Sequence, residues 1–224
     1  MTLEEAVYAR HAVRAYTDAP IGEEEGSALR QEIDACNAEG NLAIRLVQNE
    51  PKAFQSFLAK YGKFSGAANY LAIAGAPAED LNERAGYYGG RLVLKAQTLG
   101  LNTCWAALSF GKGKAKRAAD LQRGEKLICV IAIGHGQTQG VPHKGKTFAD
   151  VAAANDPPDW FLRGVEFALL APTAVNQQKF RFALFGQNEV LAERTGGFYG
   201  DIDLGIVKYH FELGAGKENF CWKE

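Results

Sequence analysis

Apolar residues recur along the chain with the spacing of amphipathic helices, and turn-forming residues separate the segments. The first segment begins with Thr2 and Glu5, whose spacing is that of a capping box. Another ends at Gly100, and a third follows an N-cap expected at Asp159 and ends before Pro172. The predicted helices are 2–10, 23–38, 88–99, 159–171 and 204–213.

Short β-branched and apolar runs between these segments predict strands. The runs are 43–47, 70–74, 127–133 and 180–185. Helices and strands in this mixture indicate an α+β fold. The stretch 137–158 is rich in Gly, Pro, Lys and small residues, which is typical of a long surface connection. We therefore expect two parts, 1–150 and 151–224.

A faint internal repeat supports this division. Gly86-Tyr87-Tyr88-Gly89 precedes the predicted helix that ends at Leu99-Gly100, and Gly197-Phe198-Tyr199-Gly200 precedes the one that ends at Leu213-Gly214. The repeat is short and requires a small insertion, so chance similarity is the alternative.

Composition narrows the class of protein. Hydrophobic residues make up 47% of the 224 residues and charged residues 23%, which is the balance of a globular protein. The formal net charge of −1 gives no electrostatic reason to expect nucleic acid or a membrane surface as partner. No run approaches ~20 uninterrupted apolar residues, and the start of the chain is acidic and unlike a secretory signal. We expect a cytoplasmic protein.

The four cysteines are scattered, and none forms a CxxC pair. This pattern is typical of reduced, mostly buried thiols. The histidines and carboxylates show no spacing of metal ligands, so we expect no metal site.

Two arginines four residues apart form the first candidate site, in Arg10-His11-Ala12-Val13-Arg14. Their guanidinium groups can converge on one anion, either along a helix face or where the chain leaves a helix. A phosphate monoester fits such forked donors. The alternative is a solvated basic face.

Adjacent carboxamides mark the second candidate, Ala171-Pro172-Thr173-Ala174-Val175-Asn176-Gln177-Gln178. Asn and Gln side chains both donate and accept, so they can bind the edge of a heterocycle such as a flavin. The alternative is a helix C-cap followed by a turn.

Two further segments are candidates. After Gly100 and Trp105, the small residues of 106–107 allow backbone amides to approach a ligand closely, although Trp105 is the kind of residue that more often belongs to a core. His143-Lys144-Gly145-Lys146 offers a second cationic arm for a phosphate, with an exposed basic turn as the alternative.

Taken together, these clusters resemble the FMN-dependent nitroreductase family, and most closely a subgroup in which one chain holds two repeats. The resemblance covers nearly the whole chain. Its strongest matches are 10–14, 83–105, 159–180 and 203–211. It implies the α+β nitroreductase-like (NADH oxidase/flavin reductase) fold, with two repeats assembled as an internal pseudo-dimer.

The resemblance also implies roles for particular residues. Arg10, His11 and Arg14 would hold the phosphate and the pyrimidine side of FMN, and Lys144 and Lys146 would bind the phosphate. The backbone of Ala106, Ala107 and Leu108 would lie near flavin N5. The segment that a partner subunit normally contributes corresponds to Pro172, Thr173, Ala174 and Asn176.

The first half, 1–150, has the arginines, whereas its counterpart of the Pro172–Asn176 segment is degenerate around 38–41. The second half, 151–224, has that segment but no arginine pair of this kind. We therefore expect the second part to complete one flavin site per chain. We also expect a monomer, with a dimer as the alternative.

The expected activity is that of an FMN-dependent oxidoreductase that passes two electrons from NAD(P)H to a small acceptor of nitroaromatic or quinone type. The flavin carries the chemistry, so no side chain is assigned as catalytic. Ala12 stands where the family commonly has serine, and Lys179-Phe180 replaces Pro-Trp. These departures favour the alternative of a non-catalytic or vestigial flavin-binding protein with a regulatory or structural role. A metal-dependent hydrolase is disfavoured, because ligand spacing is lacking.

Overall fold

The computed structural model describes residues 1–55, 57 and 61–223. The chain divides into two compact units. The first unit comprises 1–81 and 92–142, and the second comprises 82–91 and 143–224. Whether these units correspond to the two expected repeats stays a prediction.

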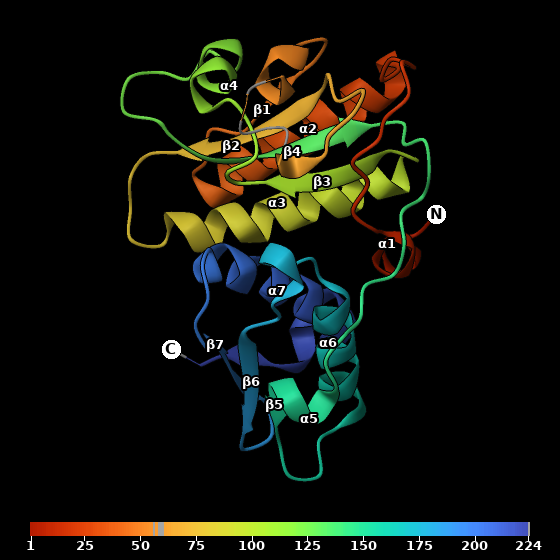
Figure 1. Ribbon diagram of the computed structural model, residues 1–224. Coiled ribbons are helices and arrows are strands. Elements are labelled where there is room, and N and C mark those ends of the chain that lie inside the picture. The colour runs from red at the N-terminus through yellow and green to blue at the C-terminus, as the bar shows by residue number, and fades with distance from the viewer. Residues whose placement is uncertain (56, 58–60, 224) are drawn as a thin grey trace. The chain divides into compact units, whose positions relative to one another are not determined.

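The first unit is built on a four-stranded antiparallel sheet (Figure 1). Its strands are β1 (Arg45–Val47), β2 (Tyr70–Gly75), β3 (Asn102–Ala106) and β4 (Lys126–Gly134), in the order β1-β2-β4-β3. Three of the four were predicted. The sequence of β3 mixes polar and apolar residues and was read only as a turn and ligand-approach segment, but its backbone pairs with β4 from Asn102 to Ala106.

This unit also contains helices, some of which contact the sheet. They are α1 (Leu3–Ala9), α2 (Glu23–Gly40), the 3-10 helix η1 (Pro51–Phe54), α4 (Lys112–Ala118) and the end of α3 (Leu81–Thr98). The capping box is confirmed, because Glu5 N donates to Thr2 Oγ1 at 3.1 Å and Thr2 N to Glu5 Oε2 at 2.8 Å. Helix α4 was not predicted, since its lysine-rich sequence has no apolar stripe and buries only Ala115.

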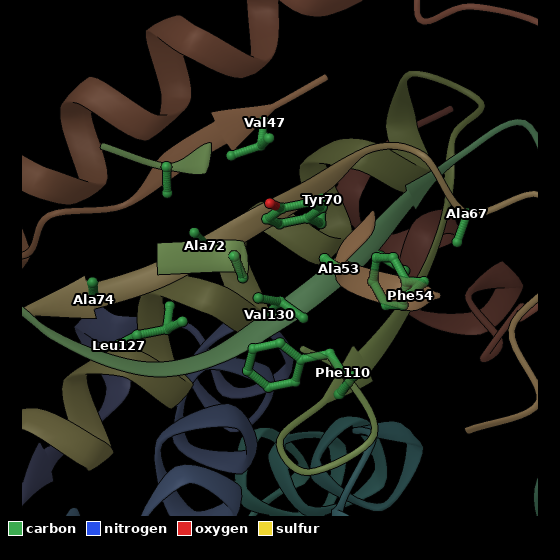
Figure 2. Packing of buried hydrophobic residues seen from close by; sticks show 14 of the residues in the cluster. Val47, Ala53, Phe54, Ala67, Tyr70, Ala72, Ala74, Phe110, Leu127 and Val130 are labelled. Atoms are coloured by element: carbon green, nitrogen blue, oxygen red, sulfur yellow. The ribbon is translucent and has the colours of Figure 1, made fainter. Parts of the chain in front are cut away.

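Buried side chains lie on both faces of the sheet. Every residue of β2 is buried, as expected for a strand covered on both sides. Tyr70, Ala72 and Ala74 belong to one cluster, together with Phe54 and Phe110 (Figure 2). A second cluster contains Leu29 of α2, Ala96 of α3 and Ile133 of β4, together with Ile21, which precedes α2, and Leu101, which precedes β3. Cys36, Cys104 and Cys129 are also buried and all four cysteines are free thiols, which confirms their interpretation.

The second unit contains a mixed four-stranded sheet. Its strands are β5 (Ala152–Ala153), β6 (Phe180–Phe185), β7 (Glu189–Arg194) and β8 (Cys221–Trp222). Strands β6 and β7 form an antiparallel hairpin, and the outer pairs are parallel. The prediction for 180–185 is confirmed, whereas β7, which alternates charged and apolar residues, was missed.

The helices of this unit are α5 (Phe148–Val151), α6 (Asp159–Leu170), η3 (Ala174–Asn176), α7 (Gly200–Ala215) and η4 (Lys217–Asn219). The prediction of Asp159 as N-cap is wrong: Pro158 is the N-cap, and Asp159 is the first helical residue. At that position its carboxylate still favours the helix through the macrodipole. The connection 137–158 includes α5 and β5, so it is not wholly irregular.

Glycines allow α7 to approach the first half of α3 within the second unit. A Cβ at Gly86 would lie 2.0 Å from Ile202 O, and one at Gly205 would lie 1.9 Å from Glu83 O. The expectation that Gly86 precedes a helix is wrong, because α3 already begins at Leu81. The corresponding 197–200 segment does precede α7, so the two sequences of the repeat have different local structures. Close backbone packing is the physical reason for Gly86.

None of the helices in the described ranges is long and apolar enough to span a bilayer.

The hydroxyl groups of two buried tyrosines differ in their hydrogen bonding. Tyr16 Oη donates to Val13 O at 2.7 Å, whereas the Tyr70 hydroxyl is enclosed with no hydrogen-bond partner in the described part of the chain. We expect Tyr16→Phe to lower the free energy of unfolding by about 1–2 kcal/mol, because it removes a bond and leaves a buried carbonyl unpaired. Tyr70→Phe should leave it unchanged or raise it by up to about 1 kcal/mol. Urea denaturation measures both, and equal losses would show that the Tyr70 hydroxyl is bonded.

Candidate cofactor site

The segment after α1 is held extended beside β3. Helix α1 ends at Ala9, and Arg10 is its C-cap with extended backbone. Val13 N donates to Thr103 O at 3.0 Å, and Arg14 O accepts from Ser65 N at 2.9 Å. The two arginines are therefore presented where the chain leaves a helix, which was one of the two arrangements considered.

Arg10 and Arg14 have different environments. Arg10 is 4% exposed, and this burial lowers the pKa of its guanidinium to about 10, an effect that Cys104 opposes. Burial raises the pKa of the Cys104 thiol, whereas Arg14 and Arg10 lower it. Both guanidinium groups therefore lie within electrostatic reach of one side chain of β3. A solvated basic face describes Arg14, which is exposed, but not Arg10.

His11, between the arginines, is half-buried. The backbone of Gly140 lies close to it, since a Cβ at Gly140 would come within 2.7 Å of His11 Cβ. Gly140 has a φ of +74°. This contact places His11 within the same packed region as the extended segment.

The backbone that follows β3 becomes progressively exposed. Ala106 is buried, Ala107 is half-buried, and Leu108 is 71% exposed in a bend. Trp105 is also half-buried, and its indole Nε1 is enclosed without a hydrogen-bond partner among the described residues. Trp105 therefore packs largely as a core side chain, whereas residues 107–108 are at least partly exposed.

The loop after α6 has an unusual backbone in the second unit. Val175, Asn176 and Gln178 have φ values of +44°, +56° and +44°, in the left-handed region. A β-branched residue is strongly disfavoured there. Val175 is nevertheless 81% exposed, so burial of its side chain does not compensate. Strain of this kind occurs at functional sites when surrounding contacts enforce it.

Asp203, in the first turn of α7, holds this loop. Ala174 N donates to its Oδ1 and Oδ2 at 2.9 and 3.1 Å. Gln177 Nε2 donates to Asp203 Oδ2 at 2.7 Å and to Phe198 O at 2.9 Å. Burial raises the pKa of Asp203 to about 6, although the bonds from Gln177 and Ala174 lower it. The sequence analysis did not identify Asp203 as a site residue, because an acid in the first turn of a helix is common.

The same loop is bonded to the predicted phosphate-binding lysines. Lys146 Nζ donates to Gln178 O at 2.6 Å, and Lys146 N donates to Gln178 Oε1 at 2.7 Å. Asn176 Nδ2 donates to Lys144 O at 2.8 Å, and Thr173 Oγ1 accepts from Gln178 N at 3.0 Å. The structure therefore brings Lys144 and Lys146 together with 173–178.

The carboxamides of this loop bond within the protein. Gln178 is buried, and its Nε2 donates to Leu169 O at 2.9 Å. Both bonds of Gln177 Nε2 are likewise internal. Through these bonds the two glutamines shape the loop, which favours the alternative of a helix C-cap followed by a turn for this part of the segment; that they also contact a heterocycle stays a prediction. Pro172, Thr173 and Ala174 are half-buried, while Asn176 is exposed.

The predicted residues thus form two groups, one in each unit. The arginine group contains Arg10, His11, Arg14 and 106–108, and the loop group contains Lys144, Lys146 and 172–176. That both groups bind one cofactor stays a prediction. Within the described ranges, no cluster of three or more His, Cys, Asp or Glu residues is arranged to hold a metal ion.

Solved structures with the same fold define the class of protein. A "putative nitroreductase" from Thermotoga maritima MSB8 has a TM-score of 0.65 at 20% identity, over 96% of this chain and 83% of that one. A "putative nitroreductase in complex with FMN" from Desulfovibrio desulfuricans has a TM-score of 0.55 at 18% identity, over 70% and 99%. A "putative NADH dehydrogenase/NAD(P)H nitroreductase" from Bacteroides thetaiotaomicron has 0.51 at 18%, over 66% and 95%. The fold is the α+β nitroreductase fold.

The family follows from the sequence. The model of the family described as "Putative TM nitroreductase" matches residues 2–215. The chain belongs to this nitroreductase family, and membership supports an oxidoreductase function. No curated protein matches the chain.

The raised pKa of Asp203 predicts a specific pH dependence of stability. Protonation stabilises the folded state more than the unfolded state, so this contribution is complete below the ordinary aspartate pKa of 3.8 and is lost as pH rises through the folded-state pKa of about 6. We expect the free energy of unfolding of the wild type, relative to Asp203→Asn, to fall by up to about 3 kcal/mol between pH 4 and pH 7. Urea denaturation at several pH values measures this. If the free energies of unfolding of the two proteins change equally with pH, the prediction is contradicted.

Proposed function

We propose that the chain is an FMN-dependent oxidoreductase that passes two electrons from NAD(P)H to a small acceptor of nitroaromatic or quinone type. The observation that carries the proposal is the pair of guanidinium groups, Arg10 and Arg14, held by extended backbone beside β3. Such a pair suits the phosphate of a mononucleotide. Because the chain belongs to a nitroreductase family, we infer that the phosphate is that of a flavin mononucleotide.

The residues of the arginine group fit this cofactor. Burial removes water from Arg10, so its charge interacts more strongly with an anion than a solvated charge does. Arg14 is exposed and can reach a ligand at the surface of the unit. The backbone at Ala107 and Leu108 offers N–H groups, and the exposed Leu108 side chain offers apolar surface to a planar ring.

The residues of the loop group supply different contacts. Lys144 and Lys146 add positive charge, and Lys146 is already oriented by its bond to Gln178 O. The exposed Val175 and Asn176 lie on a backbone that is fixed before any ligand arrives. Preorganised contacts of this type lower the entropic cost of binding. We propose that Pro172, Thr173, Ala174 and Asn176 contact the same flavin.

When bound, FMN supplies hydride acceptance and donation at its N5 atom. The chain orients the flavin and balances its charge: Arg14 would stabilise the negative charge of the reduced form, and backbone N–H groups of 106–108 would face N5. No side chain has to act as nucleophile or general base. The similarity to the Bacteroides protein, described as an NAD(P)H nitroreductase, supports NAD(P)H as donor, and the similarity to the Desulfovibrio protein in complex with FMN supports FMN as cofactor.

The alternative is a flavin-binding protein without turnover, in a regulatory or structural role. The internal bonding of the Gln177 and Gln178 carboxamides favours it, because these groups are engaged within the protein. Ala12 and Lys179 also lack the groups that the family commonly has there. A yellow protein that NADH or NADPH bleaches, and that an added quinone reoxidises, supports the enzyme. A yellow protein that neither nucleotide reduces supports the alternative.

Removal of the exposed arginine tests the phosphate-binding role. We expect Arg14→Ala to raise the dissociation constant for FMN about 10–100-fold, because a charge-assisted hydrogen bond is lost. Arg14→Lys should recover part of the affinity, since lysine keeps the positive charge but lacks the paired N–H donors of the guanidinium group. Fluorescence titration measures both. Arg123→Ala, which removes an exposed arginine of the same unit, should bind FMN like the wild type; equal weakening in both alanine variants would contradict a specific site.

The arrangement of one arginine group and one loop group predicts a single flavin per chain. We expect FMN titration to saturate at a ratio near one, with the protein monomeric in sedimentation velocity. A ratio near two would contradict the single site. A dimer that binds one FMN per chain would leave the stoichiometry intact and correct the expected oligomeric state.

A further inference from the structure

Asp203 links α7 to the loop 172–178 through hydrogen bonds. Its side chain is 5% exposed and accepts from Ala174 N with both oxygens and from Gln177 Nε2 with one. Because Gln177 Nε2 also donates to Phe198 O, both of its protons are used and the orientation of the amide is fixed. The carboxylate therefore holds the loop at two points, one through the backbone and one through a side chain.

Among the described residues, no ion pair joins the Asp203 carboxylate to a cation. Two cations of the same unit are paired with other carboxylates: Arg194 of β7 binds Asp201 at 2.7 Å, and Lys208 of α7 binds Glu83 of α3. Across the loop, Lys146 is bonded to Gln178 O. No lysine, arginine or histidine of the described residues contributes to the pKa shift of Asp203. A buried carboxylate in this position costs stability when ionised.

The bonds to Asp203 bracket two of the three left-handed residues of the loop. Ala174 and Gln177 lie on either side of Val175 and Asn176, which have left-handed backbones. No large apolar burial compensates at Val175, which is mostly exposed. The carboxylate thus stabilises a conformation that the local sequence disfavours.

We propose that Asp203 is a positioning residue, whose ionised carboxylate fixes the 172–178 loop in the conformation that receives the cofactor. The inference rests on the proposed function, because it gives the held loop a ligand. A residue kept only for stability would not be a buried, unbalanced charge. A residue kept for positioning holds the loop at the expense of global stability.

Asp203→Asn separates these two roles at pH 7.5. Asparagine keeps the shape, but one carboxylate oxygen becomes an NH2 group. In either orientation of the amide this group would face a donor, Ala174 N in the place of Oδ1 or Gln177 Nε2 in the place of Oδ2. We expect a Tm at least as high as that of the wild type, together with exchange of the Ala174 and Gln178 amide hydrogens faster by about tenfold or more. The matched control is Asp201→Asn, which neutralises a half-exposed aspartate of the same turn and should leave this exchange unchanged.

Gln177→Ala tests the same link from the side of the loop, in case Asp203→Asn fails to fold. It removes one of the bonds to the carboxylate, so a smaller acceleration of exchange in the loop is expected. Exchange in the loop that is unchanged in both variants would overturn the inference. A lower Tm with uniformly faster exchange throughout the second unit would also overturn it, because it would show a structural role only.

FMN affinity completes the test. Asp203→Asn should raise the dissociation constant about tenfold or more, whereas Asp201→Asn should not change it. Faster loop exchange with unchanged affinity would overturn the positioning role. If the wild type binds no FMN, the proposed function fails, whereas the exchange of the ligand-free protein still decides whether Asp203 holds the loop.

Discussion

The pairing of β4 with two neighbouring strands organises the first unit. β4 lies between β2 and β3, and all of its residues from Cys129 to Gly134 are buried. Because side chains alternate along a strand, one buried strand supports a cluster on each face of the sheet. Among the described strands β3 pairs only with β4, so its other edge is available to the chain that leaves α1. The position of Arg10 and Arg14 is thus a consequence of how β4 is paired.

In the second unit, the candidate site segment is a loop with less regular backbone than the extended segment beside β3. The chain leaves α6 at Ala171 and reaches β6 at Phe180 through a loop that is short and partly left-handed. Its polar groups cannot pair with a strand, so side chains from other elements satisfy them. Asp203 accepts from Ala174, and Gln178 is bonded to Leu169 and Lys146. The loop is therefore defined by buried side-chain hydrogen bonds, which are costly to leave incomplete.

The parts of the fold that sequence predicts are those with strong apolar periodicity. The strand 127–133 and the helix that begins at Asp159 are of this kind, and both are present. β3 and β7 were missed because their mixed sequences become strands only through pairing with β4 and β6. Among site residues, Arg10 and Arg14 are visible as a spaced pair. Asp203 is not, since its role depends on a loop nearly thirty residues earlier in the chain.

Arg10 and Asp203 carry opposite charges, and burial disfavours the charged form of each side chain. Each is almost completely buried, and in each case burial shifts the pKa toward the neutral form. A core built only for stability would avoid both groups, because the desolvation of a charge is unfavourable. Each is attached instead to a segment that the family resemblance associates with the flavin: the extended chain beside β3 and the loop after α6. Both buried charges therefore belong to the segments on which the proposed function depends.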